Sequence, residues 1–159
     1  MDAYADALNE LLVDTYHAIS KVEEEMLKKA GRLDLSIGEL HMIEFIAKDK
    51  ERGKSISEIA QKQDLSLPSV TIAINKLVKK GYVEKVRSRE DGRMVFVKAT
   101  REGVRADAVH QYFHRQMVRG ILREICEEDK DALLRGIHSL NSFFHRKVEE
   151  MRGMPVIGK

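Results

Sequence analysis

The sequence contains no tryptophan, only two prolines and a single cysteine in 159 residues. One cysteine excludes an intramolecular disulfide and every zinc motif that needs several cysteines. Acidic residues follow Cys126 directly, so it lacks the positive surroundings that activate a thiol, and we expect it to be inert. The scarcity of proline favours a helix-rich chain.

Long apolar runs are also missing. No stretch approaches the roughly 18 apolar residues of a membrane span, and the first 26 residues carry acids throughout, unlike a signal peptide. The composition, 43% hydrophobic and 34% charged, fits one globular domain. We therefore expect a cytoplasmic protein that does not bind membranes.

Features of enzymes are absent as well. The chain has no glycine-rich phosphate loop and no serine or cysteine nucleophile in a recognisable setting. Paired carboxylates occur only in charged runs such as Glu149-Glu150. The sequence therefore argues against catalysis.

The charge present is unevenly distributed, although the net charge is only +2. Residues 76–105 contain ten bases and four acids, whereas residues 1–35 contain eight acids and four bases. A local basic surplus is typical of a surface that binds phosphate groups. The segment around residues 76–105 is therefore the candidate nucleic-acid interface.

Capping signals predict where the first helices begin. Apolar residues recur every three or four positions in residues 3–29, which predicts a long amphipathic helix. The pairs Ser36-x-x-Glu39 and Ser55-x-x-Glu58 are capping boxes, each of which predicts the start of a further helix. A tight turn at residues 63–65 then leads to Ser66, so this region is predicted to form a helix-turn-helix.

The helix after this turn is the predicted recognition helix. Its apolar side, with Val70, Ile74 and Leu77, is expected to pack on Ile43 and Ile59. Its other side suits the major groove, because asparagine pairs with adenine and a methyl group contacts thymine. An ordinary solvated helix face is the alternative. Gly81 would end the helix. The predicted contacts with DNA are Ser66, Pro68, Ser69, Thr71, Ile72, Asn75, Lys76 and Lys79.

Two strand-forming runs follow, at residues 82–86 and 94–97. The polar segment between them contains Asp91-Gly92 and is predicted to be a turn. An arginine at the tip of such a hairpin can enter the minor groove while other bases contact phosphates. The alternative is a hairpin tip that only aids solubility. The predicted wing residues are Arg87, Ser88, Arg89, Asp91 and Arg93.

Nearly the whole chain resembles the MarR family of winged-helix transcriptional regulators. The resemblance rests on the helix-turn-helix, on Gly-Tyr-Val at residues 81–83, on Arg-Ser-x-x-Asp-x-Arg at residues 87–93, and on Thr100-x-x-Gly103. It implies that Asp91 organises the wing and that Arg93 enters the minor groove. The chain departs from the common pattern at Gly92, which weakens the wing's charge, and at Ala99, which affects packing.

The predicted fold is mainly α with a small β-wing: a winged helix-turn-helix with long N- and C-terminal dimerisation helices. The predicted parts are residues 1–35, 36–100 and 101–159. An apolar stripe in residues 128–151 leaves more apolar surface than one small domain covers, and the family resemblance also implies a homodimer. A two-fold dimer would place two recognition helices roughly 34 Å apart, which predicts a near-palindromic operator.

Residues 22–48 and 110–118 are similar to the family's repressors of fatty acid synthesis. That resemblance implies a repressor whose corepressor is acyl carrier protein bearing a long acyl chain. The acyl chain would enter an apolar space inside the protein. Alternatively, the residues around that space form only the core of the dimer. The candidate pocket residues are Val22, Met26, His41, Met42, Phe113 and Met117.

Histidines suggest a second effector, Zn²⁺, and with it a repressor of metal uptake. His110 and His114 lie four residues apart on a predicted helix, so both rings project from one side. His41 with Glu23 or Glu24 resembles ligand positions of the family's zinc-uptake repressors. The alternative is that these side chains only bond to carboxylates or backbone. A winged-helix protein adaptor that binds no DNA is a further alternative, disfavoured by the basic segment.

Overall fold

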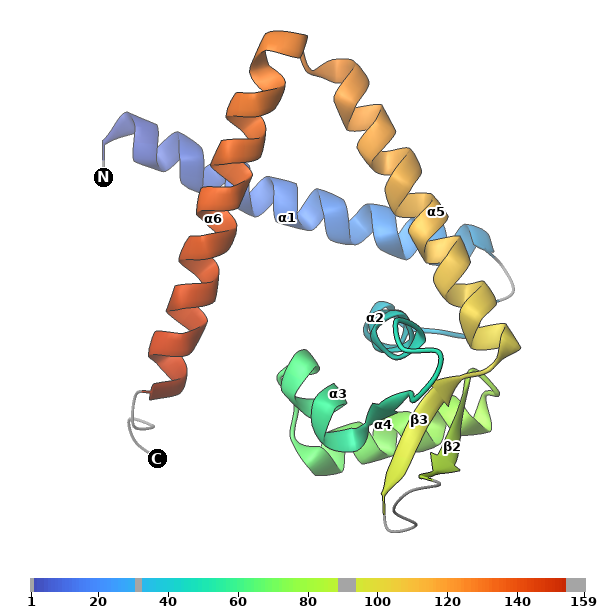
Figure 1. Cartoon of the computed structure of the whole chain (residues 1–159). Coiled ribbons are helices and arrows are strands. Elements are labelled where there is room, and N and C mark those ends of the chain that lie inside the picture. Colours follow the sequence, from blue (N-terminus) through green and yellow to red (C-terminus); the bar gives the residue numbers. More distant parts are fainter. Residues whose placement is uncertain (1, 31–32, 89–93, 154–159) are drawn as a thin grey trace. The chain divides into compact units, whose positions relative to one another are not determined.

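The computed structural model describes residues 2–30, 33–88 and 94–153. In this part of the chain the fold is mainly helical with one small sheet, as the sequence predicts (Figure 1). In chain order the elements are α1 (Ala3–Ala30), α2 (Ile37–Ala47), β1 (Lys54–Ser55), α3 (Ile56–Gln63), α4 (Leu67–Lys79), β2 (Val83–Arg87), β3 (Val95–Ala99), α5 (Arg101–Glu124) and α6 (Glu127–Gly153).

Internal contacts divide the chain into two compact units, Met1–Phe113 and His114–Lys159. The first contains every element from α1 to β3 and the first half of α5. The second contains the rest of α5 and all of α6. The sequence predicts a different division, after residues 35 and 100, into a DNA-binding part and the dimerisation helices on either side of it. That division by role stays a prediction.

Two capping boxes start α2 and α3, as predicted. The Ser36 hydroxyl accepts a bond of 3.2 Å from the Glu39 amide, and the Glu39 carboxylate accepts one of 2.8 Å from the Ser36 amide. Ser55 and Glu58 repeat this exchange at 3.2 and 2.7 Å. Each box satisfies two amides that have no partner inside the helix, so these short helices begin at defined residues.

Left-handed residues end the two helices of the helix-turn-helix. Asp64 closes α3 with φ 54°, and its short polar side chain tolerates this conformation better than most. Gly81 follows α4 with φ 82°, where glycine is not strained. Both turns lie where the sequence predicts them.

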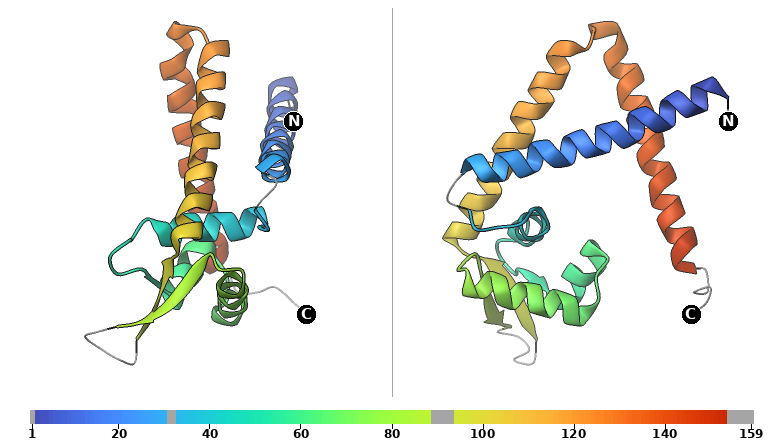
Figure 2. Two further views of the ribbon diagram at one scale, coloured as in Figure 1. Left: turned by 90° about the vertical axis from the view of Figure 1, so that its right-hand side faces the viewer. Right: turned by 180° about the vertical axis from the view of Figure 1, so that it is seen from behind.

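The sheet is antiparallel, in the order β1-β3-β2. Its β2–β3 hairpin confirms the predicted wing strands, and Figure 2 shows this hairpin extending beside α4. The sequence did not predict β1, which pairs Lys54 with Val97 and Ser55 with Phe96. Gly53 allows this pairing, because a Cβ there would lie 2.5 Å from the carbonyl oxygen of Val97.

The core of the first unit lies between α2, α3, α4 and the sheet. Val70, Ile74 and Leu77 of α4 are fully buried together with Ile43 and Ile59, which confirms the predicted packing. Burial of such side chains contributes about 1.5–3 kcal/mol each. This packing fixes the orientation of α4 relative to the wing. The other fully buried apolar members are Leu40, Ile46, Val97 and Ala106.

The second unit contains two long helical segments. Glu127, Glu128 and Asp129 lie in the first turn of α6. Negative charge at this end of a helix interacts favourably with the helix dipole and stabilises the helix. The predicted helix at residues 128–151 is therefore confirmed, with one more residue at its start and two at its end. None of the helices in the described part of the chain combines the length and the apolar character of a membrane span.

Candidate DNA interface and effector sites

The recognition helix α4 begins at a polar cap. Ser66 adopts an extended conformation, and its hydroxyl accepts a bond of 3.3 Å from the Ser69 amide. Pro68 lies in the first turn, where its missing amide hydrogen has no cost. The two serine hydroxyls also bond to each other at 2.8 Å. Ser66 and Ser69 therefore order the first turn whatever further contacts they make.

The outer face of α4 is polar in its middle except for Ile72, and Leu67 and Val78 near the two ends of the helix are 52% and 39% exposed. Ile72 is 70% exposed, whereas Ile74, two residues later, is fully buried. Asn75 and Lys79 are exposed, and Thr71 is half-buried and donates a bond of 2.8 Å to the Leu67 carbonyl. An exposed isoleucine among polar groups suits contact with a thymine methyl.

A buried carboxylate holds the end of α4. Glu39 of α2 lies 3.1 Å from the ammonium of Lys76 and 3.0 Å from that of Lys80. Burial raises the pKa of Glu39, but bonds from the Ser36 amide, Lys80 and Lys76 outweigh burial, so the pKa lies below its usual value. The carboxylate therefore stays charged. Lys76, predicted as a DNA contact, is 60% exposed and also bonds inside the protein.

The wing is described only in part. Arg87 is exposed at the end of β2, opposite Val95, and the Ser88 amide donates a bond of 2.8 Å to the Met94 carbonyl. The remaining predicted wing residues, Arg89, Asp91 and Arg93, lie outside the described residues. The described part of the wing is therefore the base of the hairpin.

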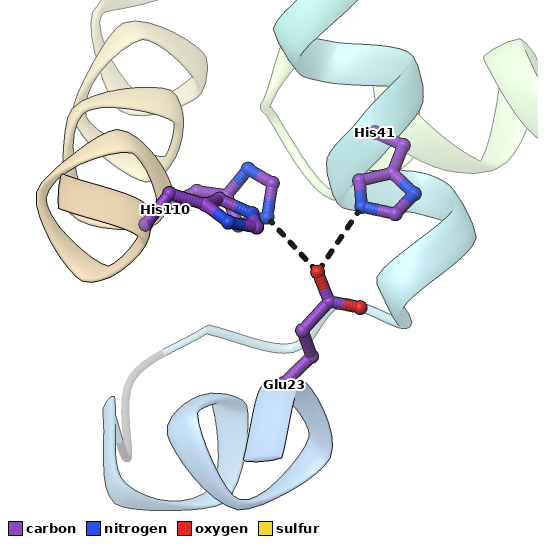
Figure 3. A group of neighbouring side chains, drawn as sticks. Glu23, His41 and His110 are labelled. Carbon is purple, nitrogen blue, oxygen red and sulfur yellow. Dashed lines mark ion pairs between the residues drawn. The ribbon is translucent and has the colours of Figure 1, made fainter. Parts of the chain in front are cut away.

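Three predicted metal ligands come together from three helices. Figure 3 shows the Glu23 carboxylate of α1 pointing toward the rings of His41 on α2 and His110 on α5. Glu23 Oε1 lies 3.8 Å from His41 Nε2 and 4.0 Å from His110 Nε2. Their possible ligand atoms lie within 4.8 Å of one another. Glu24, the other candidate from α1, is exposed and is not part of this group.

Glu44 of α2 borders the same group, with its Oε2 3.5 Å from His110 Nδ1. Burial raises the pKa of Glu44. A hydrogen bond from Lys48 and the charges of Lys48, His110 and His41 lower it by more, so the pKa lies below its usual value. His110 is 1% exposed. The group therefore combines a buried imidazole with two carboxylates. His114 follows His110 by one turn of α5, as its spacing predicts.

An apolar groove of about 570 Å³ lies in the first unit. It brings together three predicted pocket residues, Val22, Met26 and Phe113. Met42 instead lies in the core, 3% exposed, and His41 borders Glu23. Met117 belongs to the second unit. The remaining lining residues of the groove are Ala18, Lys21, Glu25 and Lys29.

Comparison with known proteins identifies the family. Residues 20–106 match the family model described as transcriptional regulator SarA/Rot. A search of curated protein sequences found no significant match.

Solved structures extend the match beyond that segment. Streptococcus pneumoniae FabT, solved in complex with DNA, is 30% identical, with a TM-score of 0.84 over 89% of this chain and 98% of FabT. Staphylococcus aureus MepR, also solved with DNA, is 15% identical, with a TM-score of 0.68 over 86% of this chain and 98% of MepR. The regulator BldR from Sulfolobus solfataricus is 22% identical, with a TM-score of 0.60 over 89% and 99%. The similarities to MepR and BldR show the fold alone.

These matches agree with the winged helix-turn-helix built around α4. The family and its neighbours are transcription regulators and not enzymes. The chain therefore belongs to the SarA/Rot transcriptional regulators, a group of DNA-binding winged-helix proteins of the MarR type.

Proposed function

We propose that the protein is a homodimeric repressor that binds a near-palindromic operator in double-stranded DNA. The observation that carries this proposal is the arrangement of α4, whose inner face is buried and whose outer face is exposed beside the basic β2–β3 hairpin. The similarity to FabT, solved with DNA at 30% identity, supports the same reading. Ile72 and Asn75 would contact bases in the major groove, Lys79 a phosphate at its edge, and Arg87 the backbone near the minor groove.

Exposed apolar side chains support self-association. On α1, Leu11 and Tyr16 are 64% and 68% exposed, and on α6 Leu134 and Met151 are 69% and 70% exposed. Large apolar surfaces of this kind are typically covered by another molecule. A second copy of the chain is the economical partner, because a two-fold dimer also presents two recognition helices to adjacent turns of DNA.

DNA binding is tested by fluorescence anisotropy with duplexes from the region upstream of the coding gene. A specific complex with six to ten phosphate contacts should lose about 10³-fold or more in affinity between 50 and 200 mM salt. Arg87→Ala should weaken binding, whereas Lys147→Ala on α6 removes the same charge and should not. Equal binding to all duplexes would contradict sequence-specific recognition.

The dimer is tested by light scattering coupled to size exclusion. The expected mass is twice the 18.2 kDa of the chain. Leu134→Glu should shift the protein toward the monomer and weaken operator binding, because a single recognition helix makes half of the contacts. A parent protein that is monomeric at micromolar concentration would contradict the proposal.

A long acyl chain delivered by acyl carrier protein is the first candidate effector. The groove with Val22, Met26 and Phe113 is mainly apolar, and Lys21 and Lys29, which also line it, would pair with an anionic group. An apolar lining with a few polar groups is typical of small-molecule sites. Occupation of this groove would favour one arrangement of the dimer on DNA.

This effector is tested with carrier protein bearing a hexadecanoyl chain. It should tighten operator binding, whereas unacylated carrier protein should not. Val22→Trp fills the groove and should abolish the response, while Val13→Trp adds the same ring to the opposite side of α1. An unchanged response in Val22→Trp would exclude the groove as the site.

Zinc is the second candidate effector, favoured by the Glu23, His41 and His110 group. Nitrogen and oxygen ligands from these three side chains suit tetrahedral Zn²⁺, and His114 is the candidate for the fourth position. Zn²⁺ would link α1, α2 and α5 and so fix the helices that carry the dimer. It would make the protein a metal-responsive repressor.

Isothermal calorimetry with Zn²⁺ tests this candidate. The parent should bind one ion per chain, and His110→Gln should lose that binding. His17→Gln changes an exposed histidine on α1 outside the group and is the matched control. Heat no greater than that of a nonspecific control would contradict the zinc site.

A further inference from the structure

A hydrogen bond between side chains joins the recognition helix to the wing. Lys85 of β2 donates from Nζ to Oδ1 of Asn75 on α4, at 2.7 Å. Both side chains are exposed, so the bond lies on the surface that the proposed function assigns to DNA. We propose that Lys85 is a positioning residue that determines which base Asn75 prefers. The inference rests on the proposed major-groove role of α4.

The chemistry of the pair determines how the amide is oriented. An ammonium group has three donors and no acceptor, so the amide atom that faces Lys85 has to be the oxygen of Asn75. The amide NH₂ group, with its two donors, then remains available to a base. Without Lys85 the amide can turn over and exchange its donor and acceptor ends.

The backbone at both residues belongs to packed secondary structure. Asn75 follows the fully buried Ile74 on α4, and Lys85 pairs in the sheet with the fully buried Val97. Other polar groups of α4 bond elsewhere: Thr71 to the Leu67 carbonyl, and Lys76 to Glu39. Packing therefore holds the backbones of Asn75 and Lys85 within reach of each other, and the bond of 2.7 Å orients the amide of Asn75.

This orientation favours guanine. In the major groove guanine presents two acceptors, N7 and O6, whereas adenine presents one acceptor and one amino donor. The Asn75 amide held by Lys85 offers donors, and the positive charge of the ammonium beside the amide oxygen repels the positively polarised hydrogens of the adenine amino group. Asn75 beside Lys85 should therefore select guanine, and not the adenine expected for an isolated asparagine.

The experiment measures binding of the full-length protein to operator duplexes in which each base pair is varied in turn. In the parent, one G·C pair in each half-site should be preferred over A·T. Lys85→Met should reduce that preference about fivefold or more while leaving preferences at other positions unchanged. Lys85→Arg, which also has only donors, should retain it.

Two further variants separate positioning from direct contact. Asn75→Ala should remove the same preference, and in that background Lys85→Met should have no further effect on it. Lys79→Met removes a charge from α4 and should lower affinity for all duplexes equally. The slope of log affinity against log salt concentration should become shallower by about one. Thermal melting of each variant shows that it is folded.

The outcomes are distinguishable. A parent that prefers adenine at the Asn75-dependent position, or a Lys85→Met variant that loses affinity uniformly, overturns the inference and leaves the proposed function intact. A Lys85→Met effect that persists in Asn75→Ala shows direct contact by Lys85 and also overturns it. A parent without any sequence preference overturns the proposed function itself.

Discussion

Glu39 of α2 and Lys80 after the end of α4 form a largely buried ion pair, with Lys80 Nζ 3.0 Å from Glu39 Oε2 and side-chain exposures of 9% and 16%. Lys80 also donates a bond of 2.6 Å to the Asp34 carbonyl. Glu39 at the same time closes the capping box with Ser36. One carboxylate therefore stabilises the start of α2 and the end of the recognition helix.

Replacement of Lys80 by methionine should lower the free energy of unfolding by about 2 kcal/mol, because it leaves a shielded carboxylate without its nearest charge partner. Urea denaturation measures this change. Lys28→Met breaks an ion pair with Glu25 in which both side chains are largely exposed, and it should change stability little. Equal losses in the two variants would contradict the role assigned to Glu39.

Acidification should weaken the fold through Glu39. Its pKa is lower in the folded protein than its ordinary value near 4.5, so its contribution to stability is present above that pH and is lost as the pH falls through the folded pKa. We expect the parent to lose stability below about pH 4.5. Glu39→Gln should show a smaller loss over the same range in urea denaturation. Parallel pH profiles of the two proteins would contradict this prediction.

Gly103→Ala should destabilise the first unit by about 2 kcal/mol, because an added methyl group must displace tightly packed backbone. A Cβ at this position would lie 2.1 Å from the Tyr82 carbonyl oxygen. Gly120→Ala, on the same helix with nothing within 4 Å of its added Cβ, is the control and should stabilise the helix slightly. Thermal denaturation distinguishes the two, and a neutral Gly103→Ala would show that the contact relaxes without cost.

Ile72→Ala should separate stability from DNA binding. Ile72 is 70% exposed, so its truncation should change the free energy of unfolding by less than about 0.5 kcal/mol. If Ile72 contacts a thymine methyl, operator affinity should fall about fivefold or more while nonspecific affinity stays constant. Anisotropy with operator and scrambled duplexes measures both. A large loss of stability would instead place Ile72 in the structural core.

Local sequence signals predicted much of the fold. Both capping boxes, the glycine after α4 and the strands of the wing depend on residues within a few positions of one another, and all are present. The strand β1 was missed because two residues carry no periodic pattern, and its pairing with β3 depends on residues more than 40 positions away.

Long-range contacts limited prediction of the sites. The spacing of His110 and His114 placed both on one side of α5, but only the fold distinguishes Glu23, which borders His41, from the exposed Glu24. The bond from Lys85 to Asn75 joins different element types, and no helical or strand period relates the two residues. Apolar spacing predicted which faces of the helices pack together, whereas this polar pair depends on the exact position of the hairpin beside α4.

Thr100 joins the recognition helix to α5 with hardly any freedom between them. Its hydroxyl donates a bond of 2.7 Å to the Gly81 carbonyl and accepts one of 3.2 Å from the Gly103 amide, while its own amide bonds to the Tyr82 carbonyl at 3.0 Å. The first turn of α5 and the end of α4 thus behave as one stiff joint. A ligand that rotated α5 near His110 would therefore be expected to change the angle of α4 as well, because these three bonds connect the two helices.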